Sequence, residues 1–155
     1  MNGKIAARIG ALFYVVWGIV HIHAAWAVYQ AGQSLGSGPI QSRISQEAWN
    51  TLAVAIAAII VAIGMNWRNS KTGFWLNIIM VSAGDLGFVL LVIVPGYMPL
   101  WPGLEGPIAW VIAAFFTALG RAGAAKATGP QQRAPELVGP GVRHASWPGG
   151  SRSGG

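Results

Sequence analysis

The amino-acid sequence predicts an all-α integral membrane protein: a four-helix bundle with up-down-up-down topology, followed by a disordered C-terminal tail. Hydrophobic residues make up 54% of the 155 residues and charged residues only 9%, far below the roughly 25% of soluble domains. Four apolar runs are long enough to cross a hydrocarbon core of about 30 Å. The segments between them are polar or rich in Gly and Pro, which interrupt helices.

The predicted transmembrane domain is residues 1–123, with helices at about residues 9–30, 49–66, 73–94 and 107–123. The first apolar run exceeds the roughly 7–15-residue core of a signal peptide, so we predict that it is retained as a spanning helix. Residues 31–46, AGQSLGSGPIQSRISQ, are predicted to be a connection, with Ser45 as the start signal of the second helix.

Residues 124–155 contain mainly Gly, Pro, Ser and Arg and show no apolar periodicity. Such a segment cannot bury enough apolar surface to offset the entropy lost on ordering, so we predict a disordered, basic cytoplasmic tail. We favour a solvated tail over the alternative, attachment of its basic residues to anionic lipid headgroups.

Basic residues are distributed very unevenly between the two predicted sides of the membrane. Arg43 alone falls on one side, and nine fall on the other: Lys4, Arg8, Arg68, Lys71, Arg121, Lys126, Arg133, Arg143 and Arg152. Because Lys and Arg are in excess in cytoplasmic loops, we expect both termini in the cytoplasm and the chain in the cytoplasmic (inner) membrane. The net charge of +6 therefore reports orientation, and we expect no nucleic-acid partner.

Metal and cofactor chemistry finds little support in the residue types. The absence of cysteine excludes disulfides, Cys-ligated zinc and iron–sulfur clusters. His21 and His23 are two residues apart, so on a helix they point about 200° away from each other. One metal ion cannot be held by both from a straight helix, because helical chelation needs a spacing of three or four. We assign no metal ligand and no cofactor.

Asp85 is one of only four acidic residues and lies within an apolar run. A charged side chain at membrane depth costs at least about 2.5–3.5 kcal/mol, so it needs a partner or a task. His21 and Asp85 are both twelve residues into their predicted helices, or about 18 Å at 1.5 Å per residue. We predict that they face each other inside the bundle, with His23 on the opposite face. Gly84 and Gly87 are expected to permit close helix contact beside Asp85.

The candidate ligand or proton site comprises Asp85, His21, Ser82, Asn77 and Trp17. Asp85 would titrate with His21 as its partner. Ser82 and Asn77 continue a polar stripe along the helix at about residues 73–94 toward its cytoplasmic end, as hydrogen-bond donors and acceptors. Trp17 precedes His21 by four residues and shares its face. The alternative, which stays open, is a structural hydrogen bond from Asp85 to a His or Asn that fixes helix order. No catalytic residue is assigned.

The chain resembles the DoxX-like group of small bacterial membrane proteins. The resemblance rests on four short helices, an N-terminus on the cytoplasmic side and a Gly-x-x-His stretch from Gly18 to His21. The resemblance covers about residues 9–123 and carries over no catalytic residue. Small multidrug exporters are similar in size, but their essential acid is a glutamate in helix 1, and helix 1 here contains none.

The expected function is to bind or transport a small or lipophilic ligand at the Asp/His site. The alternative is a non-catalytic accessory subunit or assembly factor of a larger membrane complex, for which the lipid-facing surface would matter more than Asp85. An enzyme ranks third, because no nucleophile–base arrangement or phosphate-binding loop can be assembled. Expected partners are membrane lipids and either further copies of the chain or a larger membrane complex.

Overall fold

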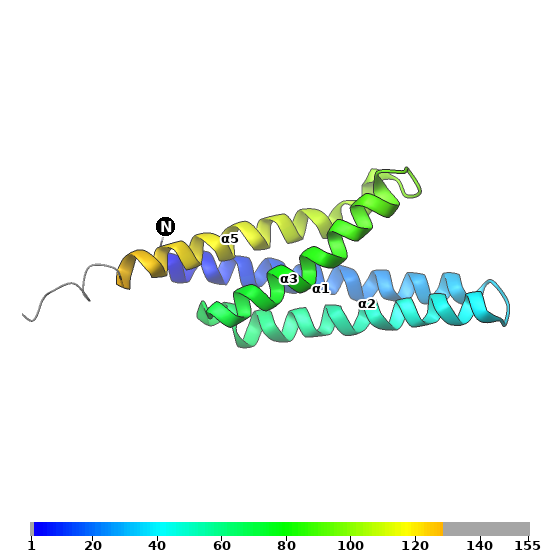
Figure 1. Ribbon diagram of the computed structural model, residues 1–155, viewed down its shortest axis with the longest axis horizontal. Coiled ribbons are helices and arrows are strands. Elements are labelled where there is room, and N and C mark those ends of the chain that lie inside the picture. Colours follow the sequence, from blue (N-terminus) through cyan, green and yellow to red (C-terminus); the bar gives the residue numbers. More distant parts are fainter. Residues whose placement is uncertain (1, 129–155) are drawn as a thin grey trace, which may run out of the picture.

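The computed structural model describes residues 2–128, and regular structure in this part of the chain is entirely helical (Figure 1). The elements are α1 (Gly3–Gln33), α2 (Pro39–Gly64), the 3₁₀ turn η1 (Asn66–Arg68), α3 (Lys71–Phe88), the π-helical turn η2 (Val89–Ile93), α4 (Leu100–Gly103) and α5 (Glu105–Thr128). Four helical stretches are long and apolar enough to cross a membrane: Gly3–Gln33, Pro39–Arg68, Lys71–Ile93 and Glu105–Lys126. The prediction of an all-α protein with four long apolar helices is confirmed; tail residues 129–155 lie outside the described residues.

Local signals explain where the long helices begin. The side chain of Asn2 accepts a hydrogen bond from the backbone N–H of Lys4 at 3.1 Å, and Ser70 accepts one from Gly73 at 3.4 Å. Such caps satisfy backbone donors that have no partner inside the first turn of a helix. Pro39 opens α2, where its missing N–H and fixed φ favour a first-turn position.

The predicted start of the second helix at residue 49 is wrong, because α2 begins ten residues earlier, at Pro39. Ser45, the predicted start signal, lies inside the helix. The polar stretch is amphipathic: Ile44 packs against Gly32 of α1, and Ala48 is buried one turn later. Ile44 and Ala48 are four residues apart and share one face of the helix, a spacing that the abundance of Ser, Gln and Gly obscured.

The other predicted boundaries are close to the observed ones and mostly too short. Helix α1 spans 3–33 instead of 9–30, and α5 spans 105–128 instead of 107–123, so five residues assigned to the tail are helical. The two helices stabilise each other's ends. A Cβ at Gly3 would lie 3.0 Å from the carbonyl oxygen of Gly120 and 3.4 Å from Cα of Gly123. This close contact supports helix where composition alone suggested a tail.

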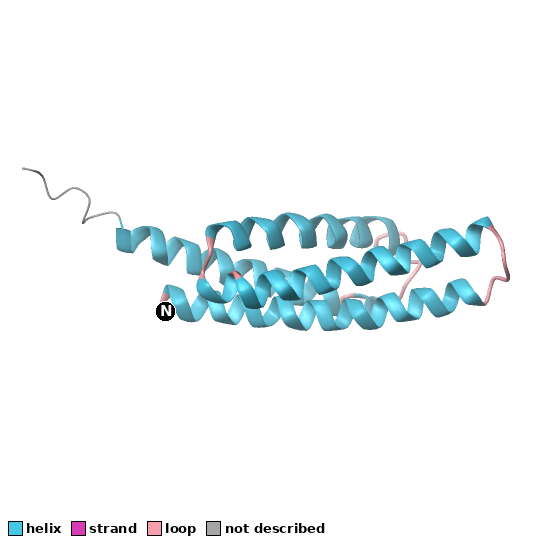
Figure 2. Cartoon of the chain, turned by 90° about the horizontal axis from the view of Figure 1, so that it is seen from below, coloured by secondary structure: helices cyan, strands magenta, loops and turns pink. Residues whose placement is uncertain are grey.

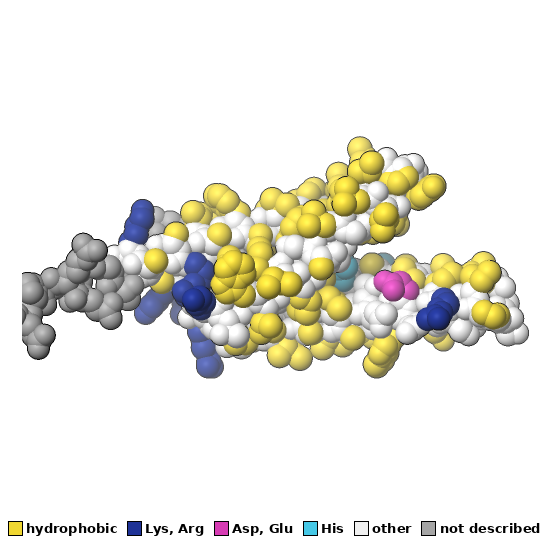
Figure 3. All heavy atoms as spheres, viewed as in Figure 1, with side chains coloured by type: hydrophobic (Ala, Val, Ile, Leu, Met, Phe, Trp, Pro, Cys, Tyr) yellow, Lys and Arg dark blue, Asp and Glu magenta, His cyan; other side chains and the backbone are white. Residues whose placement is uncertain are grey.

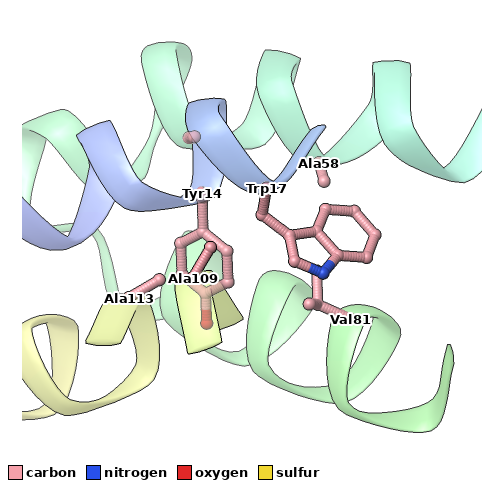
Figure 4. Packing of buried hydrophobic residues seen from close by; sticks show 7 residues of the cluster. Tyr14, Trp17, Ala58, Val81, Ala109 and Ala113 are labelled. Atoms are coloured by element: carbon pink, nitrogen blue, oxygen red, sulfur yellow. The ribbon is translucent and has the colours of Figure 1, made fainter. Parts of the chain in front are cut away.

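Helix α1 is the centre of the fold, because it packs along most of its length against both α2 and α5. Figure 4 shows two large aromatic side chains of α1, Tyr14 and Trp17, surrounded by small or β-branched residues of the other helices. The buried cluster consists of Tyr14, Trp17, Ala58, Ala62, Val81, Ala109 and Ala113. Alanine allows the neighbouring backbones to come close enough to enclose the two rings.

Helix α3 is packed less extensively and diverges from α1 and α2 along its length (Figure 1). Helices α1 and α2 continue past the ends of α3 and α5 and form a projecting arm, residues 26–48 (Figures 1 and 2). Figure 3 shows a notch where this arm separates from α3 and α5, with histidine side chains visible inside it. The candidate functional site lies at this notch.

Candidate functional site

Asp85 is completely buried, with an exposed fraction of 0%. Its Oδ2 atom accepts a hydrogen bond of 2.8 Å from the indole Nε1–H of Trp17, so α3 is tied directly to α1. Figure 4 shows the indole nitrogen of Trp17 directed toward α3. A buried carboxylate requires such compensation, because removing it from water without a partner is strongly unfavourable.

His21 contacts the other carboxylate oxygen. Its Nε2 lies 3.4 Å from Oδ1 of Asp85, which makes no hydrogen bond within residues 2–128. Its Nδ1 lies 2.9 Å from the backbone carbonyl oxygen of Trp17. A carbonyl oxygen only accepts hydrogen bonds, so Nδ1 must carry a hydrogen.

With a hydrogen on Nδ1, only Nε2 of His21 and the carboxylate of Asp85 can carry a further proton of the pair. In a neutral imidazole protonated at Nδ1, Nε2 of His21 has a lone pair, which would face a lone pair on Oδ1 of an ionised Asp85. The repulsion disappears if one proton lies between the two atoms, on His21 as an imidazolium or on Asp85 as a carboxylic acid. In both cases one proton lies between Nε2 and Oδ1, in addition to the hydrogen on Nδ1, and the pair is electrically neutral overall, which suits a buried position.

The imidazole of His21 is held on two further sides. It stacks on the indole of Trp17, with ring centroids 3.8 Å apart and an angle of 24° between the planes. On another side it packs against Gly106, where an added Cβ would lie 2.5 Å from Cε1 of the imidazole. The side chain nevertheless stays 19% exposed. His21 therefore connects buried Asp85 to the outside, whereas His23 is exposed on the opposite face, as predicted.

The position of the site along the bundle can be counted from the end at which both Arg121 and Asn69 lie. There the Arg121 guanidinium donates to the Asn69 carbonyl at 2.8 Å. From Asn69 to Asp85 is about 24 Å along α3, and from Arg121 to Gly106 about 22 Å along α5, at 1.5 Å per residue. The equal-depth prediction for His21 and Asp85 agrees with their contact. Counted from that end, Asp85 and Gly106 lie at nearly the same distance along the bundle, toward the notch.

Ser82 and Asn77, the other two predicted polar members of the site, bond elsewhere. Ser82 accepts a 2.9 Å hydrogen bond from the indole of Trp110 in α5. Asn77 is fully buried and donates at 3.2 Å to the carbonyl oxygen of Ala58 in α2, while its Oδ1 has no partner within residues 2–128. The structure thus brings Asp85, His21 and Trp17 together, and Ser82 and Asn77 link α3 to other helices. A role of these residues in binding a ligand or a proton stays a prediction.

Two features of the site were not predicted. The direct bond from Trp17 to Asp85 had only an indirect signal, the spacing of four between Trp17 and His21. The packing of Gly106 on His21 had none, because it depends on how α5 crosses α1. The expected role of Gly84 and Gly87 is wrong: a Cβ at either position would meet nothing within 4 Å.

The arrangement places one carboxylate beside one imidazole, two groups that can share a proton. Within residues 2–128, no group of three or more His, Asp and Glu side chains is placed to hold a metal ion. A π-helical turn begins at Val89, four residues after Asp85, with the Val94 N–H bonded to the Val89 carbonyl at 2.8 Å. Such turns occur often at functional sites, and this one changes which faces of α3 point inward beyond the carboxylate.

Comparison of the chain with protein-family models, with curated proteins and with solved structures finds no match in any of the three. The arrangement of the site must therefore be interpreted from its own chemistry.

Proposed function

We propose that the chain spans the cytoplasmic membrane as an up-down-up-down bundle with both termini in the cytoplasm. Four helices of sufficient length and apolarity support this, together with the gathering of Lys and Arg side chains at one end of the molecule in Figure 3. The layout and the Gly18-x-x-His21 stretch support membership of the DoxX-like group. Reporter fusions after Gly36 and after Gly129 should report opposite sides of the membrane; the same side for both would contradict the topology.

The function that the geometry supports best is binding or transport of a small or lipophilic ligand, coupled to the proton held by Asp85 and His21. The observation that carries this proposal is the fully buried Asp85, closed on one side by Trp17 and on the other by His21. Ionisable residues inside a membrane commonly mark ligand or proton pathways.

His21 would be the group that opens the site. Both oxygens of Asp85 face a partner, and His21 alone of the pair is partly exposed. An arriving ligand or proton therefore meets His21 first and gains access to Asp85 only when the imidazole moves away. Because α3 diverges from α1 near the notch, such movement does not require the tightly packed α1–α5 contact to open.

Native mass spectrometry of the full chain, purified in mild detergent, tests the proposal. Wild-type protein should retain a small-molecule adduct that Asp85→Asn loses, since this change removes the charge and nearly preserves the shape. Glu105→Gln is the matched control, because it removes a carboxylate outside the pair and should retain the adduct. Thermal unfolding must show that both variants are folded. Identical adducts in wild type and Asp85→Asn, or no adduct in any sample, would contradict the ligand role.

The alternative function, an accessory subunit or assembly factor, is favoured by the projecting arm. Its surface exposes large apolar side chains that no other helix covers within residues 2–128: Trp26, Tyr29, Leu35 and Ile40. A partner protein could bury them. In this case Trp26→Ser with Ile40→Ser should abolish copurification of a partner from mild detergent, whereas Asp85→Asn should leave it unchanged. Loss of copurification in Asp85→Asn alone would contradict this alternative.

A further inference from the structure

One end of the described structure carries nearly all of its basic residues and is named here the basic end. It is formed by the start of α1, η1, the start of α3 and the last turns of α5. Six of the seven Lys and Arg residues within 2–128 lie there: Lys4, Arg8, Arg68, Lys71, Arg121 and Lys126. Figure 3 shows these dark blue side chains gathered at the end from which the chain starts. The three acidic residues of the same part, Glu47, Asp85 and Glu105, lie on other segments.

The basic end is hollowed. A cavity of about 360 Å³ lies between α1, η1 and α5, lined by Asn2, Gly3, Lys4, Arg68, Asn69, Gly123 and Ala124. Its two cations, the Lys4 ammonium and the Arg68 guanidinium, form no ion pair within residues 2–128. The volume exceeds that of a phosphate group several times, so an anion could enter together with part of the molecule that carries it.

The surroundings hold the cavity in shape. Two hydrogen bonds join α5 to the residue after the η1 turn. The Arg121 guanidinium donates to the Asn69 carbonyl at 2.8 Å, and the Asn69 side-chain amide donates to the Gly120 carbonyl at 2.9 Å. The Arg8 guanidinium lies 5.5 Å from the centre of the Trp67 ring. These contacts fix the η1 turn against α1 and α5, and they leave Lys4 and Arg68 available to an outside anion.

We propose that this cavity binds the phosphate group of an anionic phospholipid. The phosphate would interact with Lys4 and Arg68, near the N-terminus of α1, where the helix dipole also favours negative charge. Apolar surface begins directly beside the cavity, with exposed Ile5 and Trp67. Farther along, an apolar groove of about 440 Å³ runs over α3 from Lys71 to Met80 and could hold an acyl chain. A lipid therefore fits this region better than a free anion.

The proposal rests on the proposed membrane location but not on the Asp85 site, and one titration tests it. Full-length protein in mild detergent is titrated with phosphatidylglycerol or with phosphatidylcholine of the same acyl chains, and bound lipid is counted by native mass spectrometry. Wild type should prefer phosphatidylglycerol. The double variant Lys4→Gln/Arg68→Gln should lower that affinity about 30-fold, since each basic residue near an anionic surface contributes a factor of about five.

Three controls separate the explanations. Arg43→Gln/Lys126→Gln removes the same charge from two residues that do not line the cavity, of which Lys126 belongs to the basic end, and should retain the affinity; an equal loss would show unspecific charge attraction and overturn the proposal. Asp85→Asn should bind the lipid like wild type, so a failure of the ligand proposal at Asp85 can be distinguished from a failure of the lipid proposal. Millimolar inorganic phosphate should not displace the lipid, and displacement would assign the cavity to a free anion instead. Equal binding of both lipids would also overturn the proposal, provided that thermal unfolding shows folded variants.

Discussion

Helix α1 is held to its neighbours in two different ways. Against α5 and α2 it relies on glycine: a Cβ at Gly10 would lie 2.7 Å from the backbone nitrogen of Thr117 and 2.9 Å from the carbonyl oxygen of Ala113, and a Cβ at Gly18 would lie 3.0 Å from the Ala55 carbonyl oxygen. At such distances the backbones themselves are in contact. Against α3, α1 instead relies on side chains, through the hydrogen bond of Trp17 to Asp85 and the contact of His21 with Asp85.

Beyond Gly73, where a Cβ would lie 2.5 Å from Cβ of Met65, the attachment of α3 follows the second pattern. Asn77 bonds to α2, Asp85 to α1, and Ser82 to α5 through Trp110. Its own glycines near the site, Gly84 and Gly87, approach no other helix. Polar side chains thus connect α3 to all three neighbours, whereas shape complementarity holds the other helices together.

The difference indicates which part of the molecule can change conformation. Contacts between backbones fit in one arrangement only, because close-packed interfaces do not deform continuously. Hydrogen bonds of side chains can be exchanged for bonds to a ligand or to water at small net cost. A conformational change that keeps the backbone contacts of α1 with α2 and α5 would therefore act on the side-chain hydrogen bonds of α3, including the bond of Asp85 to Trp17.

The largest effect is expected from Gly10→Val, which fills the contact between α1 and α5. The new side chain would collide with backbone atoms of α5, which cannot move aside as a flexible side chain would. We expect a loss of about 3 kcal/mol or more in the free energy of unfolding, at or above the upper end of overpacking. Unfolding by SDS titration in mixed micelles measures it.

Gly87→Val is the matched control for this change, because a Cβ there meets nothing within 4 Å. It introduces the same side chain into a membrane helix and should alter the unfolding free energy by less than about 1 kcal/mol. Similar losses for the two variants would contradict the distinction between a backbone-packed α1 and a side-chain-bonded α3.

An intermediate effect is expected at the buried carboxylate. Trp17→Phe removes the indole donor to Asp85, and Asp85→Asn removes the charge of the acceptor; each should destabilise the bundle by about 1–3 kcal/mol. Combined, they should be non-additive by about 1 kcal/mol or more, because the two side chains share one bond. The pair Trp17→Phe and Ser82→Ala is the control and should be additive, since Ser82 bonds to Trp110. Because the asparagine of Asp85→Asn keeps an acceptor oxygen, additivity in the first pair would show that the charge of Asp85 adds nothing to the bond from Trp17.

The sequence was sufficient for the parts of the fold that follow from helical period and burial of apolar residues. The number of long helices and the approach of His21 to Asp85 follow from run length, a 1.5 Å rise per residue and the cost of exposing charge to lipid. The start of α2 did not follow, because Gly, Ser and Pro in residues 31–46 suggested a loop while Ile44 and Ala48 kept the helical period.

The details of the site were less predictable, for a physical reason. Which donor reaches Asp85, and which residue packs on His21, depend on helix crossing angles that a single helix does not encode. Trp17 and Gly106 contribute through such crossings, and Ser82 was assigned to Asp85 because it lies three residues away, although it faces α5. Spacing along one helix identifies a shared side of that helix but not the helix that lies opposite.

The smallest effect is expected from Ser82→Ala, which removes the acceptor of the Trp110 indole at the α3–α5 contact. Both side chains are only partly buried, so the Trp110 N–H can turn to another acceptor or to water. Hydrogen bonds between membrane helices contribute about 0.6 kcal/mol on average, and we expect a loss of about that size. The shift should be visible as a small change in the SDS midpoint, with the copurified adduct of wild type retained. A loss as large as that of Asp85→Asn would mean that Ser82 acts together with the carboxylate after all, as its position three residues before Asp85 first indicated.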